Sequence, residues 1–117
     1  MEKLAAMRCV ACRGDEPALT EAQIAELLPQ VAQWDVVEKN GIKRLERAFE
    51  FRNFSQAMAF TNQISDLAES EDHHPMIVTE WGEVKVNWWT HKIGGLHRND
   101  FIMAAKTDDL YANLPKD

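Results

Sequence analysis

The sequence predicts an α+β domain of order α-β-β-α-β-β-α, with a four-stranded antiparallel sheet and helices packed on one face. Two pairs of stretches, 34–37 with 43–51 and 76–79 with 83–90, have the β-branched, aromatic and alternating residues of strands. Three further stretches, before, between and after these pairs, carry apolar residues at helical spacing. Strands joined in succession by short turns pair antiparallel, and amphipathic helices cover one side of such a sheet.

The first helix and the first hairpin have local signals at their boundaries. Thr20 stands three residues before Gln23, the spacing of a capping box, and apolar residues then follow at helical spacing. Asn40-Gly41 is a dipeptide that favours a tight hairpin turn. We therefore expect a short helix from Thr20 and a hairpin around Asn40-Gly41.

The second and third helices are also predicted from their ends. Asn53 or Ser55 can cap a long helix that ends between residues 70 and 72, because Pro75 disfavours helix in the residue before it. A second hairpin turns at 81–82. The last helix is expected to start near His97 and to fade before Pro115.

Length and composition indicate one domain and argue against nucleic-acid and membrane partners. Residues 1–19 show no periodicity, so we expect a poorly structured extension followed by a single domain over 20–117. The net charge of -6 and the scattered basic residues argue against a nucleic-acid partner. No stretch approaches the roughly 20 apolar residues of a membrane span, and no signal peptide is recognisable, so we expect a cytoplasmic protein without a membrane partner.

Cys9 and Cys12 form a Cys-x-x-Cys pair within the N-terminal extension. Such a pair is half of a zinc site or a redox dithiol in other contexts, but no second pair of cysteines is present. We favour two free thiols in a mobile arm, with the metal and redox interpretations left open.

All four histidines lie within residues 73–97, and several carboxylates lie near them. Each has an ordinary structural explanation when taken alone: His97 as an exposed residue at a helix cap, His91 as a surface histidine, and Asp100 as a residue that stabilises a helix N-terminus. The combination is unusual for a structural core. Its members are His73, His74, His91, His97, Glu69, Glu71, Asp72 and Asp100.

His73-His74-Pro75 places two imidazoles in succession where the second helix must end, and Glu69 lies four residues before His73. Histidine can serve as acid or as base near neutral pH, so this junction suits proton transfer. Zinc binding is the competing interpretation. It is disfavoured because adjacent histidines cannot share the i, i+4 face of a helical His-x-x-x-His pair.

These residues together resemble the signature of the pterin-4a-carbinolamine dehydratase family. That signature has an acidic residue, His-His-Pro, an aromatic residue, a further histidine and an aspartate at set spacings. The segment 49–54 and the pair Thr90-His91 resemble the family as well, and the likeness spans about residues 20–112. The positions that match the signature are Glu69, His73, His74, Pro75, Trp81, His91 and Asp100.

The resemblance implies a hydro-lyase that dehydrates 4a-hydroxytetrahydropterin to the quinonoid dihydropterin and supports tetrahydropterin recycling. It implies a homodimer or homotetramer and no cofactor, because only protons are moved. His73 and His91 are then the acid/base pair, and His74 binds and orients the pterin. The implied substrate-binding residues are Glu69, Asp72, Trp34 and Thr90, with Asp100 behind them as a supporting or helix-capping residue.

The sequence departs from animal members in the arm with Cys9 and Cys12 and in Trp89, which replaces a small hydroxyl residue. Two other functions stay open on the resemblance. One is a role in another pterin or molybdopterin pathway, with which Trp89 is compatible. The other is a dimerisation cofactor of transcription, as in animal members, although no residue pattern here indicates such a partner.

Overall fold

A computed structural model describes residues 3–10, 14 and 16–114. The described chain contains three α-helices, four strands and three short 3-10 helices. The α-helices are α1 (Glu21–Leu27), α2 (Phe54–Glu71) and α3 (Arg98–Ala112); the strands are β1 (Asp35–Lys39), β2 (Ile42–Glu50), β3 (Met76–Glu80) and β4 (Glu83–Trp88); and the 3-10 helices are η1 (Leu4–Ala6), η2 (Leu28–Val31) and η3 (His91–Ile93).

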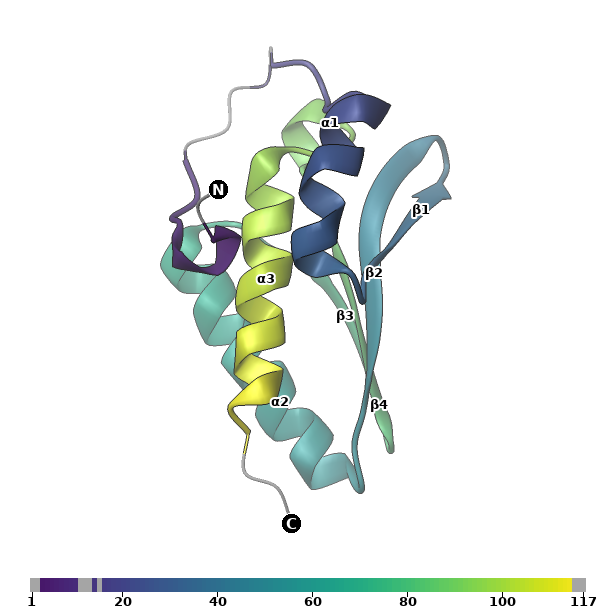
Figure 1. The fold of residues 1–117 in the computed structure, drawn as a ribbon. Helices are drawn as coiled ribbons and strands as arrows, with labels where there is room; N and C mark the ends of the chain where they lie inside the picture. The colour runs from purple at the N-terminus through teal and green to yellow at the C-terminus, as the bar shows by residue number, and fades with distance from the viewer. Residues whose placement is uncertain (1–2, 11–13, 15, 115–117) are drawn as a thin grey trace.

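The four strands form one antiparallel sheet in the order β1-β2-β4-β3. The helices lie on one side of this sheet, with α2 and α3 running along it and α1 beside the upper half of α3 (Figure 1). The α+β class, the element order and the one-sided packing predicted from the sequence are therefore confirmed.

The local boundary signals formed as predicted. Thr20 and Gln23 make both hydrogen bonds of a capping box at α1, and Asn53 caps α2 by accepting from the Gln56 N–H. Asn40 and Gly41 have φ angles of 54° and 79°, as the primed hairpin turn requires. These interactions involve residues at most three apart, which is why the sequence could predict them.

The hydrophobic core lies between the sheet and helices α2 and α3. Phe49 of β2 and Trp88 of β4 are 1% and 0% exposed, and Phe49 packs on Phe60 of α2 with ring centroids 4.9 Å apart. Phe101 of α3 is also fully buried. Burying one such aromatic side chain stabilises the fold by about 1.5–3 kcal/mol, so these contacts fix the two helices on the sheet.

The open face of the sheet is less polar than simple alternation suggests. Asn87 and Trp89 point away from Trp88, yet they are only 1% and 9% exposed. The Arg44 guanidinium lies 3.9 Å from the centroid of a Trp89 ring and covers it. Phe54 is 49% exposed because it is the first residue of α2 and lies at the edge of the core.

The described part of the N-terminal segment packs against the domain although only η1 is regular. Leu4 is 1% exposed, and its N–H donates to Gln30 Oε1 at 2.9 Å. Lys106 Nζ of α3 donates to the Ala5 carbonyl oxygen at 2.9 Å. Cys12 lies outside the described residues. No helix among the described residues is long and apolar enough to cross a membrane.

Candidate active site

The end of α2 presents the paired histidines. Asp72 follows the helix with a left-handed φ of 52°, and the His73 N–H donates to the Ala68 carbonyl oxygen at 3.1 Å. This is the hydrogen bond that closes a Schellman-type helix end. The chain then turns through His74 and Pro75 into β3, so both imidazoles project from a fixed backbone.

His73 is held between an aromatic ring and a carboxylate. Its ring stacks on Trp88 with centroids 5.8 Å apart and an interplanar angle of 8°. Its Nε2 lies 2.6 Å from Oδ1 of Asp100, and the side chain is 11% exposed. Because a carboxylate accepts, Nε2 carries a proton and Nδ1 is the ring nitrogen left for a ligand.

Asp100 is a buried carboxylate with three donors. Besides His73, the Thr90 hydroxyl donates to its Oδ2 at 2.8 Å, and the His97 N–H donates to the same oxygen at 2.9 Å. The side chain is 0% exposed, so these bonds replace the water it lost on folding. The last bond belongs to the capping box of α3, so a single residue both begins the helix and orients His73.

The other two histidines of the site are more exposed. His74 Nε2 lies 2.5 Å from Glu69 Oε2, and their side chains are 55% and 73% exposed. His91 begins η3, and its ring packs against Trp89 with centroids 4.5 Å apart. No polar partner of the His91 ring lies among the described residues, so its nitrogens are open to a ligand.

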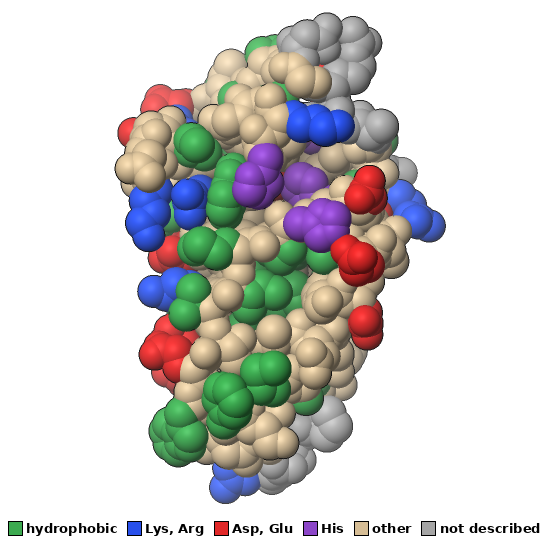
Figure 2. Space-filling model, turned by 180° about the vertical axis from the view of Figure 1, so that it is seen from behind, with side chains coloured by type: hydrophobic (Ala, Val, Ile, Leu, Met, Phe, Trp, Pro, Cys, Tyr) green, Lys and Arg blue, Asp and Glu red, His purple; other side chains and the backbone are tan. Residues whose placement is uncertain are grey.

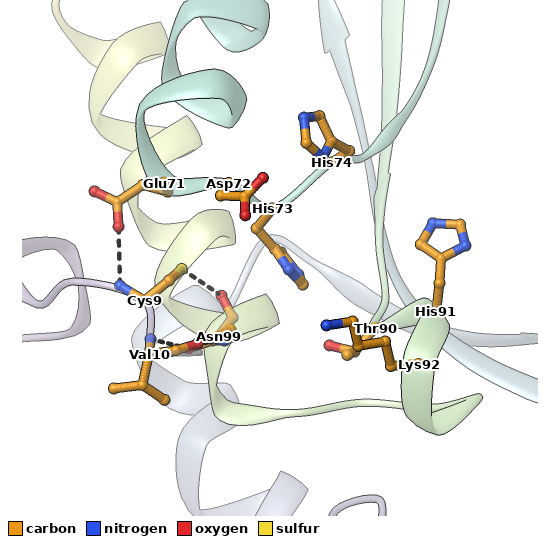
Figure 3. Close-up of a pocket in the computed structure, with 10 residues that line it drawn as sticks. All are labelled: Cys9, Val10, Glu71, Asp72, His73, His74, Thr90, His91, Lys92 and Asn99. Atoms are coloured by element: carbon orange, nitrogen blue, oxygen red, sulfur yellow. Dashed lines mark hydrogen bonds between the residues drawn. The ribbon is translucent and has the colours of Figure 1, made fainter. Parts of the chain in front are cut away.

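A cavity of about 480 Å³ joins these groups. Seen from behind the view of Figure 1, histidine side chains gather in the upper half of the molecule, with acidic residues beside them (Figure 2). In Figure 3, His74 and His91 lie on one side and Cys9 and Val10 on the other. The residues that line the cavity are Cys9, Val10, Glu71, Asp72, His73, His74, Thr90, His91, Lys92 and Asn99.

Two residues of the N-terminal arm contribute to this cavity, which sequence reasoning missed. The Cys9 N–H donates to Glu71 Oε1 at 2.9 Å, and Asn99 bonds both the N–H and the carbonyl oxygen of Val10, at 3.0 and 2.8 Å. Some 89 residues separate Asn99 from Val10, so no local pattern could have indicated this contact. Lys92 and Asn99 are the other lining residues not anticipated, whereas the sequence already singles out Glu71 among the carboxylates near the histidines.

The structure brings together most of the predicted site residues, but Glu69 reaches the cavity only through its contact with His74, and Trp34 does not reach it. Among described residues Trp34 is absent from the cavity lining; its Nε1 donates to Asp108 Oδ1 at 2.8 Å, and its ring packs edge-on against Phe49.

The expectation that His97 is an exposed cap residue is wrong in one respect. His97 caps α3, but it is 8% exposed and its Nε2 lies 3.0 Å from Glu16 Oε2.

Burial also defines the chemistry of the arm cysteine. Burial, and then the negative charges of Glu71 and Asp100, raise the pKa of the Cys9 thiol to about 12. The group is therefore a neutral thiol near neutral pH rather than a thiolate ligand. Within the described residues no three His, Cys, Asp or Glu side chains are grouped so as to hold a metal ion.

The fold and the site together define a class of small α+β proteins: a four-stranded antiparallel sheet covered by helices, with the α2–β3 junction and η3 bringing imidazoles to one cavity and a buried carboxylate of α3 behind them. Sequence comparison then identifies the family within this class. The family model described as "Pterin 4 alpha carbinolamine dehydratase" matches residues 17–110. The chain belongs to this family.

Individual relatives agree with the family. A protein of Marinobacter nauticus named "Putative pterin-4-alpha-carbinolamine dehydratase" is 54% identical over 111 residues, which are 95% of this chain and 100% of that protein. A crystal structure from Brucella melitensis, named as a transcriptional coactivator/pterin dehydratase, has 33% identity and a TM-score of 0.73, covering 80% of this chain and 98% of that one.

A more distant structure shows the fold alone. It is named as a pterin dehydratase-like protein that is a RuBisCO assembly factor in the alpha-carboxysome. It has 24% identity and a TM-score of 0.58, and the match covers 68% of this chain and 89% of that one. The same fold therefore accompanies differently named roles.

Proposed function

We propose that this protein is a hydro-lyase that dehydrates 4a-hydroxytetrahydropterin to the quinonoid dihydropterin and water. Membership of the family and the 54% identity to the Marinobacter nauticus protein support the reaction class. The observation that carries the proposal is the contact of His73 with buried Asp100 at a cavity that His74 and His91 also line.

The cavity suits a compact heterocycle with polar edges. Its volume of about 480 Å³ falls in the range typical of small-molecule sites, about 300–1,000 Å³. Imidazole, hydroxyl and carboxylate groups line it, so it offers both donors and acceptors to the nitrogen and oxygen atoms of a pterin. Asp72 and Thr90, predicted as substrate-binding residues, are among the lining residues.

The reaction breaks the C4a–O bond while the N5 lone pair forms the C4a=N5 bond. One proton must reach the leaving oxygen, which departs as water, and the N5 proton must be removed. We assign removal of the N5 proton to Nδ1 of His73, because Asp100 holds the Nε2 proton and stabilises the imidazolium that results. Protons are the only groups exchanged between the substrate and the protein, so the scheme requires no cofactor.

We assign protonation of the leaving oxygen to His91. Its side chain is exposed and can recover a proton from solvent after each turnover. His73, packed against Trp88 and Asp100, returns the proton taken from N5 through Nδ1 to water that enters the cavity once the product leaves. His74, paired with Glu69, binds and orients the pterin edge. Two imidazoles in different environments can thus take opposite roles at one pH.

The direct test uses chemically generated 4a-hydroxytetrahydropterin, whose loss is followed spectroscopically with and without the protein. Binding of 7,8-dihydrobiopterin, a stable analogue, is measured separately by calorimetry. The proposal predicts saturable binding together with dehydration well above the spontaneous rate. Analogue binding with no acceleration would leave a pterin-binding protein that is not this enzyme.

We further propose that the protein assembles as a homodimer or homotetramer, as the family resemblance implies. The sheet order leaves β1 and β3 as edge strands, and an unpaired edge can pair with a second chain. Light scattering coupled to gel filtration should give a mass two or four times that of one chain. A monomeric mass at micromolar concentration would contradict the proposal.

Protein binding is the second candidate function. It is favoured by the name of the Brucella melitensis relative, which includes a transcriptional coactivator, and by the exposure of Trp81 and Val78, 70% and 45%, near the second hairpin. Affinity capture with the parent chain and with Trp81→Ser would test it. A stable partner lost on that substitution, in a chain without dehydratase activity, would favour this function over the enzyme.

A further inference from the structure

The N-terminal arm reaches the cavity as a fixed wall. Upstream, Leu4 is buried, and the Ala5 carbonyl accepts from Lys106 of α3. Closer to the cavity, Arg8 Nε lies 3.2 Å from Glu71 Oε2, a carboxylate that also accepts from the Cys9 N–H. Contacts on two helices therefore hold the arm in place before any ligand arrives.

Asn99 completes this attachment. The Asn99 side chain is buried at the start of α3 and satisfies both backbone groups of Val10, in the manner of a paired strand. A bidentate amide contact of this kind fixes the orientation of Val10 as well as its position. The dashed contacts in Figure 3 trace the path from Glu71 through Cys9 to Val10 and Asn99.

The surface left to a ligand on this wall is apolar. The backbone N–H groups of Cys9 and Val10 and the Val10 carbonyl are already bonded. The side chains that remain are that of Val10, which is 63% exposed and apolar, and that of Cys9, whose thiol donates to the Asn99 carbonyl oxygen at 3.9 Å and is protonated near pH 7. A polar edge of the ring that faced these two side chains would lose hydrogen bonds to water and would not regain them here. This side of the cavity therefore suits an apolar part of the ligand.

The opposite side of the cavity has the groups that the polar and reacting parts of a pterin need. His74 and His91 lie there, with His73 and Thr90 between them and the arm (Figure 3). N5 must face the acid/base histidines, and the neighbouring carbon, C6, carries the pterin's variable substituent. Because C6 is bonded to N5, a pterin whose N5 faces His73 carries this substituent beside His73. His73 lies between His91 and the arm, so the substituent can extend past it toward Cys9 and Val10 (Figure 3).

We propose that Cys9 and Val10 form the wall that contacts the C6 substituent of the pterin and selects among pterins that differ there. This inference rests on the proposed function for the identity of the ring. Both residues precede residues 17–110, the part of the chain that matches the family. The selectivity is therefore assigned from the geometry of this chain.

Substrate selectivity tests the wall. Val10→Gly keeps the backbone bonds to Asn99 and removes the apolar surface, and Val10→Asn replaces it with a polar one. The substrates are 4a-hydroxytetrahydropterins with a methyl or a 1,2-dihydroxypropyl group at C6. We expect each variant to change the ratio of the two kcat/KM values by about fivefold or more, mainly through KM. Ala6→Ser, on the exposed side of the arm, should leave the ratio unchanged.

A readout without catalysis separates the inference from the proposed function. Hydrogen exchange of the Cys9 and Val10 amides should slow when 7,8-dihydrobiopterin is added, because the ligand closes over them. Slower exchange in a protein that does not dehydrate would reject the enzyme and retain the wall. Dehydration with unchanged exchange and an unchanged substrate ratio would reject the wall and retain the enzyme. Absence of dihydrobiopterin binding would overturn both.

Discussion

The Nε2 atom of His73 lies 2.6 Å from Oδ1 of Asp100, a carboxylate with no exposed surface. The two residues are 27 positions apart, and α2 and α3 bring them together. The same carboxylate accepts the His97 N–H at the start of α3. The contact that starts a helix thereby fixes the tautomer and direction of the imidazole assigned to proton transfer.

Replacing Asp100 by Asn should separate its two roles. Asn can still accept the His97 N–H but cannot stabilise a charged His73, so kcat should fall by about a hundredfold or more while the chain still folds. Asp109→Asn, an exposed position on the same helix, is the matched control. Steady-state rates and thermal melting should be measured together. A parent-like kcat in Asp100→Asn would show that the carboxylate does not assist His73.

Trp34→Phe tests the position that the structure gives to Trp34. Phe keeps the ring contact with Phe49 but loses the hydrogen bond to Asp108 at 2.8 Å, so urea unfolding should show a loss of about 1–3 kcal/mol. The KM for the pterin should not change, since this ring does not line the cavity. Trp81→Phe, at a 70% exposed site, serves as the control for stability. A raised KM in Trp34→Phe would restore Trp34 as a substrate contact.

The Cys9 thiol should react slowly with alkylating reagents, and the free energy of unfolding should fall as the pH becomes alkaline. Because its pKa is raised from 9.0 to about 12, the folded state keeps a proton that the unfolded state loses first, so stability should fall as pH rises through this interval. Iodoacetamide labelling in a Cys12→Ser background should be at least about tenfold slower in native than in urea-unfolded protein at about pH 9. Equal rates would mean that Cys9 is not shielded.

The first hairpin provides a test of stability remote from the site. Gly41 has a φ of 79°, which a β-branched residue rarely adopts, so Gly41→Val should cost about 1–3 kcal/mol in urea unfolding. Gly41→Asn should cost less, because Asn tolerates positive φ. Dehydratase rates of both folded variants should match the parent. Equal stability of the Val and Asn variants would argue against the primed turn.

Features with local causes could be predicted from the sequence. The cap at Thr20, the turn at Asn40-Gly41 and the end of α2 before Pro75 depend on neighbours within a few residues, and they formed where expected. The pairing of Asn99 with Val10 could not be predicted, because it joins distant segments through an ordinary helix residue. Trp34 shows a different limit: a tryptophan beside a strand suits a core and a ligand wall equally well.

The kcat of His73→Ala and His91→Ala, compared with that of His97→Asn, tests the central claim most directly. His97 is the matched control, because it belongs to the same histidine-rich region, does not line the cavity, and Asn preserves its helix cap. We predict that kcat falls by about 10²–10⁴-fold in both alanine variants and stays within about threefold of the parent in His97→Asn. Parent-like dehydration by folded His73→Ala and His91→Ala would contradict histidine acid/base catalysis at this site.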